Sequence, residues 1–363
     1  MKEKIAFIAV GQAGGNIGSR LECKGYNVLY INTSKEDLDT LGNAKIKHHI
    51  KNGEGCNKDR IKAKQALIDD FDEVSRKIYD SLDKEFVYII FSSGGGTGSG
   101  AGPMLADLLL GDIEDGVSGK LQNVGIITIL PSLKEPVKTN INAYECFTEL
   151  SKVEGLSGTF VLDNERGDKM VLNTQFVNTF ASFLDIPNKH KSERGNIDKA
   201  EIMEALRTTG MIQLAQLPAK ASTTEAVLEK LNNCIFAESE HDGIVKYITV
   251  SQAGNFDIDI LQKEVGMPVD VFSTYNDHST ICCLSGLTYP KARLDKAYAM
   301  ISDNKERVMR SMNANTSIEM KEGINFLQES ARSKSVRESR RTRTSENKDV
   351  SRSNRRDILK KYI

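Results

Sequence analysis

A buried strand that runs directly into a cluster of glycines constrains this chain more than any other feature. Residues 87–91 (VYIIF) are apolar, β-branched or aromatic, and Pro103 fits the first turn of a helix expected after the glycines. In a strand–loop–helix unit the N–H groups of the loop and the positive end of the helix dipole converge, so the unit predicts phosphate binding rather than a flexible surface loop. The loop residues are Gly94, Gly95, Gly96, Thr97, Gly98, Ser99 and Gly100.

The N-terminal segment repeats this arrangement. Residues 5–10 (IAFIAV) predict a buried strand, followed by a glycine turn and a helix. Ala13 occupies the second glycine position of the dinucleotide fingerprint, and the next strand, 27–31, ends in Asn-Thr-Ser rather than an acidic residue, which disfavours an NAD-dependent dehydrogenase. No G-x-x-x-x-G-K-[ST] motif occurs, which excludes a P-loop NTPase. The turn residues are Gly11, Gln12, Ala13, Gly14, Gly15 and Asn16.

Both glycine loops follow strands that we expect in one parallel sheet. The carboxyl ends of parallel strands meet at one edge, where open α/β sheets bind their ligands. One such loop holds a diphosphate, and two converging loops suit a longer polyphosphate.

The motifs GQAGGNIG and FSSGGGTGSGAG resemble those of the tubulin/FtsZ superfamily of GTPases, in which GGGTGSG is the signature phosphate loop. The resemblance extends to about Gly286 and implies an α/β fold: a Rossmann-like parallel-sheet GTPase domain, a central helix, a smaller α+β domain, a long C-terminal helix and a basic tail. Residues 53–57 (GEGCN) resemble the third loop of the plasmid- and phage-borne TubZ branch. The implied boundaries are 1–172 for the GTP-binding domain, 173–190 for the central helix, 191–290 for the activation domain, 291–330 for the long helical stretch and 331–363 for the tail.

The same resemblance implies GTP and GDP as ligands, with Mg²⁺, for which the sequence identifies no direct protein ligands. Asn32 and Thr33 match the family's second nucleotide loop. Gly53 and Gly55 match its third loop, near the γ-phosphate. Glu135 is the candidate for the sugar hydroxyls, although a solvated loop acid is an equally simple interpretation.

Two asparagines match the family's readers of guanine. Asn164 follows the strand predicted at 159–163, and Asn173 opens the helix predicted next. An amide both donates and accepts hydrogen bonds, which suits the guanine edge. Taken singly, a turn for Asn164 and an N-cap for Asn173 are the simpler interpretations; their spacing from the phosphate loops favours the guanine role.

An acidic loop follows the predicted central helix. Asp198 is a candidate N-cap, and Glu201 three residues later is typical of a capping box. Through the resemblance, Asn196, Asp198 and Glu201 match the loop that completes the nucleotide site of the next subunit in a filament, where an acid orients the attacking water and accepts its proton.

The rest of the chain predicts alternating elements. A stripe of phenylalanines at 176, 180 and 183 predicts the buried face of the central helix. We expect helices at 202–217, 223–236 and 257–265 and strands at 124–130, 244–251, 269–275 and 280–284. A long polar helical stretch then covers 291–330.

Charge is unevenly placed. The net charge is −1, but residues 332–363 hold twelve Lys or Arg against four Asp or Glu, so this tail carries +8 and the rest −9. The tail's composition predicts disorder, and by resemblance to the TubZ branch it engages an adaptor protein bound to centromere-like DNA. Direct contact with DNA is an alternative.

The cysteines are scattered, which predicts reduced thiols in a cytoplasmic chain. The sequence shows no signal-peptide pattern and no apolar run of about 18 residues, so we expect no membrane contact. The resulting hypothesis is a GTPase that polymerises head to tail with GTP, hydrolyses it at subunit contacts and moves a plasmid or phage DNA. An FtsZ-like division scaffold is the alternative.

Overall fold

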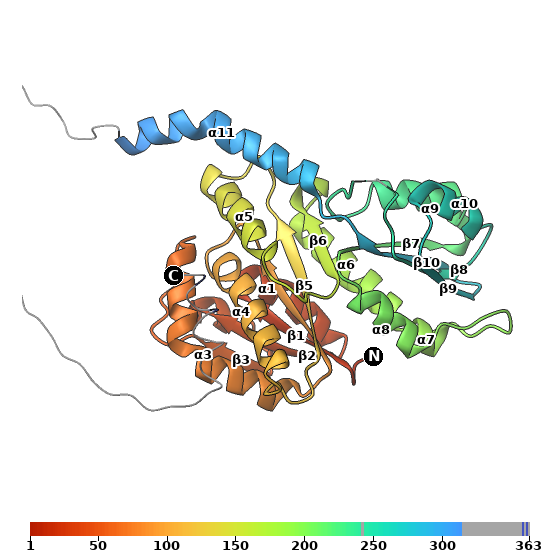
Figure 1. Ribbon diagram of the computed structural model, residues 1–363, viewed down its shortest axis with the longest axis horizontal. Coiled ribbons are helices and arrows are strands. Elements are labelled where there is room, and N and C mark those ends of the chain that lie inside the picture. Colours follow the sequence, from red (N-terminus) through yellow and green to blue (C-terminus); the bar gives the residue numbers. More distant parts are fainter. Residues whose placement is uncertain (241–242, 314–357, 359–360, 362–363) are drawn as a thin grey trace, which may run out of the picture.

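The computed structural model describes residues 1–240, 243–313, 358 and 361, and it contains a single ten-stranded sheet. The strands follow the order β3-β2-β1-β4-β5-β6-β7-β10-β8-β9 (Figure 1). The strands are β1 Ile5–Val10, β2 Asn27–Asn32, β3 Ile46–His49, β4 Phe86–Ser92, β5 Asn123–Leu130, β6 Thr159–Asp163, β7 Met211–Pro218, β8 Tyr247–Gln252, β9 Asp270–Tyr275 and β10 Ser279–Leu287.

Strands β1 to β6 form a parallel region with the order of a doubly wound nucleotide-binding fold. Their near-continuous apolar runs suit strands that are covered on both faces, and β1 and β4 are almost completely buried. The strands predicted from the sequence at 5–10, 27–31, 87–91, 124–130 and 159–163 are all present. The strand order reverses between β1 and β4, which are direct neighbours.

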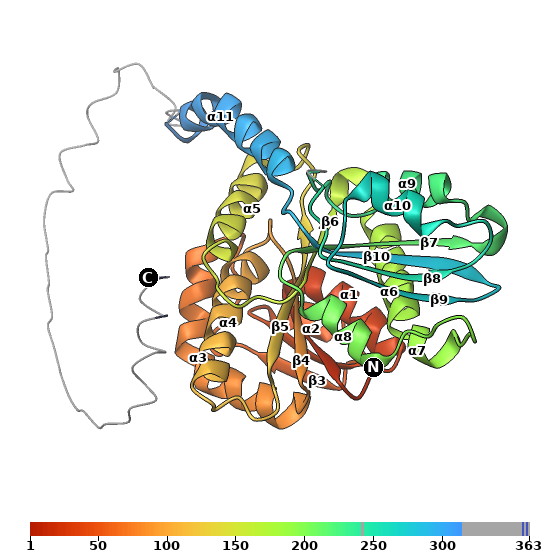
Figure 2. The same cartoon turned by 45° about the vertical axis from the view of Figure 1, so that its right-hand side comes forward.

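Helices cover both faces of the sheet (Figures 1 and 2). Apolar side chains of α3, α4 and α5 pack on one face of the parallel region, and those of α1, α6 and α8 pack on the other. The helices are α1 Gly11–Cys23, α2 Lys35–Asp39, α3 Arg60–Leu82, α4 Thr97–Glu114, α5 Val137–Leu150, α6 Lys169–Leu184, α7 Ile186–Lys189, α8 Lys199–Arg207, α9 Thr224–Asn232, α10 Ile258–Val265 and α11 Lys291–Asn313, with short 3-10 helices at Asn164–Arg166 and Ala219–Ala221.

Helix α6 is the central helix, and its predicted phenylalanine stripe is buried. Phe176, Phe180 and Phe183 are fully covered and join the cluster that links the parallel strands to β7 and β10. The helix begins at Lys169 and is capped by the side chain of Asp168, so it starts four residues before Asn173. The N-cap interpretation of Asn173 is therefore wrong, because that residue lies in the second turn.

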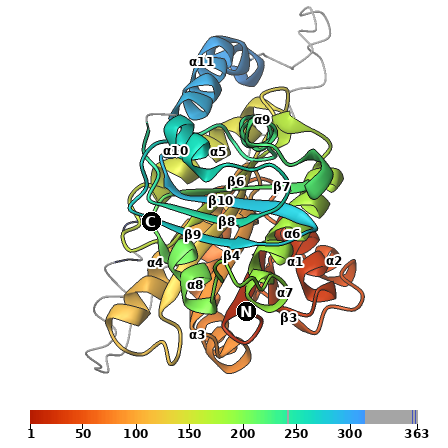
Figure 3. The same cartoon turned by 90° about the vertical axis from the view of Figure 1, so that its right-hand side faces the viewer.

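The mixed region contains β7 to β10, with α9 and α10 on one side and α6 and α8 on the other (Figure 3). The helix expected at 202–217 is wrong in its second half. Helix α8 ends at Arg207, Gly210 has φ +122, and β7 begins at Met211. Side chains of the stretch MIQLAQLP point alternately to the two faces of the sheet. Ile212 and Leu214 pack on the α6 side, whereas Met211 and Ala215 pack on the α9 side. The parallel and mixed regions share one ladder pair, Thr159 with Met211.

Among the described residues, no helix is both long and apolar enough to cross a bilayer. All six cysteines are free thiols, as the sequence analysis predicted. Five of them are buried, and burial raises the pKa of Cys146 and Cys282 to about 12. These two thiols are therefore unreactive at neutral pH.

Helix α11 runs across the top of the molecule in Figures 1 and 2 and is attached by a buried ion pair. The Arg293 Nε donates to Asp163 Oδ2 at 2.7 Å, and Arg293 Nη2 donates to Asp163 Oδ1 at 3.1 Å and to the Pro131 carbonyl at 2.7 Å. Both side chains are under 10% exposed. The predicted helical stretch at 291–330 is present to Asn313, and its remainder and the predicted disordered tail lie outside the described residues except for Ile358 and Lys361.

We expect Arg293→Ala to lower the free energy of unfolding by about 3–5 kcal/mol, because it leaves the Asp163 carboxylate buried without its partner. Denaturant unfolding of the full chain measures this change. The control is Arg310→Ala in the same helix, whose ion pair with Glu306 is more than 80% exposed. That variant should change stability by less than about 1 kcal/mol. Equal effects of the two substitutions would contradict the role of Arg293 as a buried anchor.

Candidate functional site

The carboxyl ends of β1 and β4 open into a cavity of about 480 Å³. The two strands pair in register from Ile5 with Phe86 to Ala9 with Ile90, so the loops that follow them lie side by side. Several residues predicted from the sequence line this cavity: Gly11, Gln12, Ala13, Asn32, Gly55, Gly94, Gly95, Gly96, Thr97, Gly98 and Glu135. Ser34, Cys56 and Asn57, which belong to the matched second and third loops, also line it, as do residues that the sequence analysis did not single out: Val10, Asp37, Lys58, Ser92, Thr139 and Lys169.

The glycines of the first motif have two different roles. Gly11 lines the cavity and has φ +70, a conformation that glycine adopts without strain, and α1 begins there. Gly14 does not line the cavity. A Cβ on Gly14 would lie 2.3 Å from the Ile90 carbonyl oxygen, so this glycine lets α1 pack directly on β4. Gly15 and Asn16 also lie outside the cavity lining.

The second glycine loop forms the N-terminus of α4. Gly96 is the N-cap and Thr97 is the first helical residue, so the free N–H groups of this turn and the helix dipole are directed at the cavity. The loop is fixed from behind by the Asn142 amide, which donates to the carbonyls of Gly95 at 2.9 Å and Lys58 at 3.0 Å. Ser99 turns inward and donates to the Gly95 carbonyl at 2.5 Å.

Pro103 lies one turn deeper in α4 than the sequence analysis expected, because the helix begins at Thr97. A proline has no N–H, so the Ser99 carbonyl four residues earlier loses its helical partner. The buried Arg60 replaces it, with Nη2 donating to that carbonyl at 3.1 Å. Arg60 also pairs with Glu145 at 2.9 Å and Glu149 at 2.5 Å on α5. The first turns of α3 and α4 are therefore joined through one guanidinium.

Two further predicted residues support the cavity without lining it. The hydroxyls of Thr33 and Thr97 are 2.7 Å apart in a buried hydrogen bond, and Thr33 Oγ1 lies 3.3 Å from Cys56 Sγ. A Cβ on Gly53 would lie 2.5 Å from the Thr33 carbonyl oxygen. These contacts hold together the loops after β2, after β3 and after β4.

Two lysines supply positive charge at the cavity. Lys58 Nζ donates to Thr139 Oγ1 at 2.7 Å, and Lys169 Nζ lies 2.8 Å from Glu135 Oε1. Sequence reasoning missed both. Lys58 directly follows the glycine-containing segment 53–57, and Lys169 is the first residue of α6. Their positions relative to the cavity depend on the fold, because exposed lysines are common and carry no local signal. Together with the N–H groups these lysines give the cavity donors that suit an anion, although the carboxylates of Asp37 and Glu135 also line it.

The predicted guanine readers lie beside the cavity and not in its lining. The Asn164 amide is 3.4 Å from Glu135 Oε1. Asn173 is 6% exposed and lies four residues after Lys169 on α6, so the two residues share one face of that helix. The guanine role of the two asparagines stays a prediction.

The acidic loop lies at the opposite edge of the sheet. Lys199, the first residue of α8, places Nζ 2.5 Å from an oxygen of Glu3, which precedes β1, and this hydrogen bond lowers the pKa of Glu3 to about 2. Arg207 at the end of α8 pairs with Glu85, which precedes β4. A six-residue strand such as β1 spans roughly 20 Å, so this loop is remote from the cavity of its own chain.

The acidic loop is internally ordered. The Asp198 carboxylate accepts from the N–H groups of Ala200 at 2.7 Å and Glu201 at 3.0 Å, and Glu201 Oε2 accepts from the N–H of Asp198 at 2.8 Å. The predicted capping box is therefore present. Asn196 Oδ1 accepts from the N–H of Ser192 at 2.9 Å. Asn196 and Asp198 are exposed, so the loop presents ordered polar groups to solvent.

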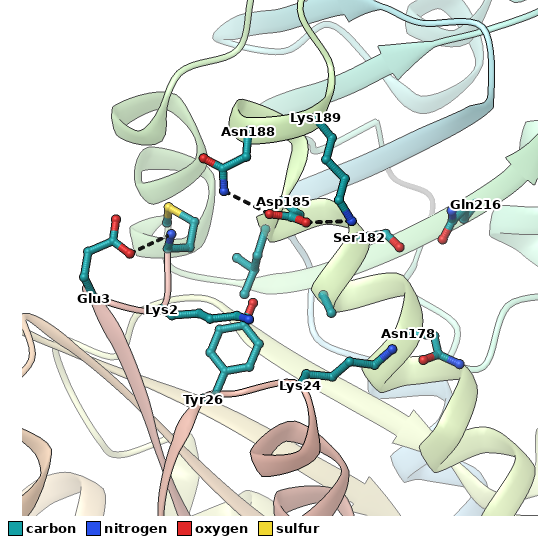
Figure 4. Close-up of a pocket in the computed structure, with 13 residues that line it drawn as sticks. Lys2, Glu3, Lys24, Tyr26, Asn178, Ser182, Asp185, Asn188, Lys189 and Gln216 are labelled. Atoms are coloured by element: carbon teal, nitrogen blue, oxygen red, sulfur yellow. Dashed lines mark hydrogen bonds and ion pairs between the residues drawn. The ribbon is translucent and has the colours of Figure 1, made fainter.

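A second cavity of about 640 Å³ lies at this same amino edge (Figure 4). Lysines 2, 24 and 189 contribute to it, but Lys189 pairs with Asp185 at 2.8 Å and Lys2 lies over the Tyr26 ring. No glycine loop and no N-terminus of a helix of eight or more residues lines it. Among the described residues, the first cavity is therefore the better site for a phosphate chain.

Known proteins share this arrangement. The model of the Tubulin/FtsZ family, GTPase domain, matches residues 4–171. The chain is 30% identical over 328 residues to the tubulin-like protein TubZ of Clostridium botulinum C phage, covering 88% of this chain and 89% of that protein. It is 27% identical over 266 residues to the tubulin-like protein CetZ of Pyrococcus abyssi, covering 68% of each.

Solved structures agree. The crystal structure of TubZ from Clostridium botulinum phage c-st matches with a TM-score of 0.76 and 26% identity, covering 85% of this chain and all of that one. A GTPγS-form protofilament of TubZ from Bacillus thuringiensis serovar israelensis matches with a TM-score of 0.71 over 86% of this chain and 95% of that one. At 16% identity the second match shows the fold alone.

We expect Gly95→Ala and Gly14→Ala to separate ligand binding from packing. A Cβ on Gly95 meets only one atom within 4 Å, at 3.9 Å, so its methyl group enters the cavity and should weaken GTP binding at least about tenfold with little loss of stability. Gly14→Ala forces α1 away from β4 and should lower the free energy of unfolding by about 1–3 kcal/mol. Isothermal titration with GTP and denaturant unfolding measure the two effects. Tight GTP binding by the folded Gly95→Ala variant would contradict the placement of phosphates against this loop.

Proposed function

This chain belongs to the tubulin/FtsZ family of GTPases, and from that premise we propose that it is a filament-forming GTPase that moves or segregates a plasmid or phage DNA in the cytoplasm. GTP binds in the cavity at the carboxyl edge, subunits assemble head to tail, and hydrolysis takes place at the contact between them. The proposed boundaries are those of the sequence analysis, except that the central helix begins at Lys169, so the GTP-binding domain ends at residue 168.

The proposed pose places the triphosphate between the two glycine loops. The N–H groups at the start of α4 and the ammonium groups of Lys58 and Lys169 neutralise its charge. Glu135 accepts hydrogen bonds from the sugar, and Asn164 and Asn173 bind the guanine edge. The ion pair between Lys169 and Glu135 ties the beginning of the central helix to this ligand.

Mg²⁺ fits the donor set of the cavity. Its two carboxylates lie on different segments, Asp37 on α2 and Glu135 in the loop before α5, and no group of three or more His, Cys, Asp or Glu side chains is placed to hold a metal in the described ranges. Mg²⁺ usually keeps several waters and is held by one or two carboxylates together with phosphates. When bound it neutralises the phosphate charge, while the chain supplies N–H and ammonium groups around it.

One observation carries the proposal of assembly-dependent hydrolysis: the glycine loops and the acidic loop lie at opposite edges of the same parallel strands. No carboxylate of the acidic loop lines the cavity of its own chain. Stacking a second subunit head to tail brings its amino edge onto the carboxyl edge of the first. Asp198 and Glu201 of one subunit then orient the attacking water and accept its proton at the nucleotide of the next, with Asn196 helping to hold the loop.

The basic tail is the proposed attachment to DNA. Its net charge of +8 contrasts with the acidic body. A basic segment of this kind can bind an acidic adaptor protein or the phosphates of DNA by electrostatic attraction, which weakens as the salt concentration rises. An adaptor bound to a centromere-like site is the partner we favour.

We expect Asp198→Asn and Glu201→Gln to bind GTP and assemble, but to hydrolyse GTP about 10²–10⁴-fold more slowly. Asparagine is as good an N-cap as aspartate, and glutamine also completes a capping box, so both variants keep α8 capped and remove only a carboxylate. Phosphate release and right-angle light scattering, followed together after GTP addition, measure turnover and assembly.

The matched control is Glu204→Gln, which removes an exposed carboxylate one turn later in α8 and should leave turnover unchanged. The wild-type rate per subunit should also fall when the protein is diluted below its assembly threshold. Wild-type turnover in Asp198→Asn and Glu201→Gln, or a rate that does not depend on concentration, would refute a site shared between subunits.

We expect a chain that ends at Ser330 to polymerise and hydrolyse GTP like the full chain, and to lose capture of adaptor–DNA complexes. A pulldown at fixed salt, with a DNA-binding adaptor protein bound to its DNA site, measures the capture. A full-length chain with the tail's Lys and Arg replaced by Gln separates the effect of charge from that of length. Undiminished capture by the shortened chain would rule out the tail as the attachment.

A further inference from the structure

Two residues from the end of the chain lie against the GTPase domain. Ile358 packs at the margin of the apolar cluster that α3, α4 and α5 form on one face of the sheet. Lys361 Nζ lies 3.5 Å from Asp107 Oδ2 on α4. The Lys361 N–H donates to the Ile358 carbonyl at 3.0 Å, so the two residues belong to one turn.

The surface that receives them matches them in shape and charge. A Cβ on Gly111 would lie 2.7 Å from Ile358 Cδ1, so the absence of a side chain there makes room for the isoleucine. Asp107 lies one helical turn before Gly111 on the same face of α4, and its carboxylate is 11% exposed. We call Asp107 and Gly111 the α4 docking face. The net charges of the basic tail and the acidic body are also of opposite sign, which favours their association.

We propose that the C-terminal end of this chain is a ligand of its own GTPase domain, with Ile358 filling the space above Gly111 and Lys361 pairing with Asp107. The tail then has two states. In the docked state its end is held on the flank of the domain, and in the released state that end is accessible to other molecules. This inference rests on contacts among described residues and does not require the proposed role of the tail in DNA attachment.

Docking leaves the nucleotide cavity open. Helix α4 begins at Thr97, beside the cavity, and Gly111 follows fourteen residues later. At 1.5 Å per residue the docking face lies about 21 Å along the helix from the phosphate loop. The α4 docking face is therefore separate from the nucleotide site, and docking should not change the affinity for GTP or GDP.

The test uses the full chain with a fluorophore on a cysteine added after Ile363. Cys23 is the exposed cysteine among the six, and Cys23→Ser confines labelling to the tail. Time-resolved anisotropy in GDP, without assembly, measures the fraction of label that tumbles with the domain. We expect most of the label to tumble slowly in this parent chain.

Three substitutions should release the label. Ile358→Asp should lower the ratio of docked to released tail at least about tenfold, because it replaces the half-buried apolar side chain that packs on the cluster with a carboxylate. Lys361→Glu should lower the ratio about threefold to fivefold. Gly111→Leu should lower it by filling the space from the other side, and its matched control is Gly42→Leu, where a Cβ meets no atom within 4 Å.

The two tail variants keep the test decisive if Gly111→Leu fails to fold, because they leave the sequence of the folded body unchanged. A freely mobile label in the parent chain, or an unchanged slow fraction in Ile358→Asp, would overturn the proposal. A slow fraction that rises with protein concentration would also overturn it, since docking would then occur on a neighbouring copy.

Discussion

Parallel pairing between β1 and β4 is the constraint on which the rest of this structure depends. The register joins Ala9 to Ile90, and both strands end at the same edge of the sheet. Each is followed at once by glycine-rich backbone that starts a helix. The cavity exists because two such starts lie side by side at the point where the strand order reverses. A register shift of one residue would offset one loop from the other by about 3.3 Å and would turn every side chain of the strand to the opposite face, so packing of the apolar side chains on both faces also fixes the site.

The parallel region and the glycine loops could be predicted from the sequence, because continuous apolar runs and glycine clusters are local signals. The second half of the expected helix at 202–217 could not. Its apolar residues fit either a helix or a strand, and the pairing of Met211 and its neighbours with β10 decides for the strand. The position of Pro103 was also misjudged. The helix begins earlier because Arg60, distant in sequence, satisfies the carbonyl that the proline leaves unpaired.

The candidate site shows the same division between local and distant information. Residues that line the cavity through their backbone were found from motifs, whereas Lys58 and Lys169 were not. A lysine acquires meaning only when the fold places it beside an anion site, and no spacing rule specifies that. Gly14 illustrates the converse. It belongs to the glycine motif, yet its contact with the Ile90 carbonyl shows that it serves the packing of α1 on the sheet. One motif therefore carries both ligand-binding and packing residues.

Helix α4 connects the nucleotide cavity with the proposed docking of the tail, and its packing decides whether the two are coupled. Ligands shift an equilibrium only when they bind its two states differently, so coupling would require α4 to move when the nucleotide changes. Arg60 fixes the start of α4 to α3 and α5, and buried leucines hold its length against the sheet. We therefore expect α4 to present the same Asp107 and Gly111 whatever occupies the cavity. For the proposed docking we therefore expect release of the tail to depend on competition for its basic end, and not on the state of the bound nucleotide.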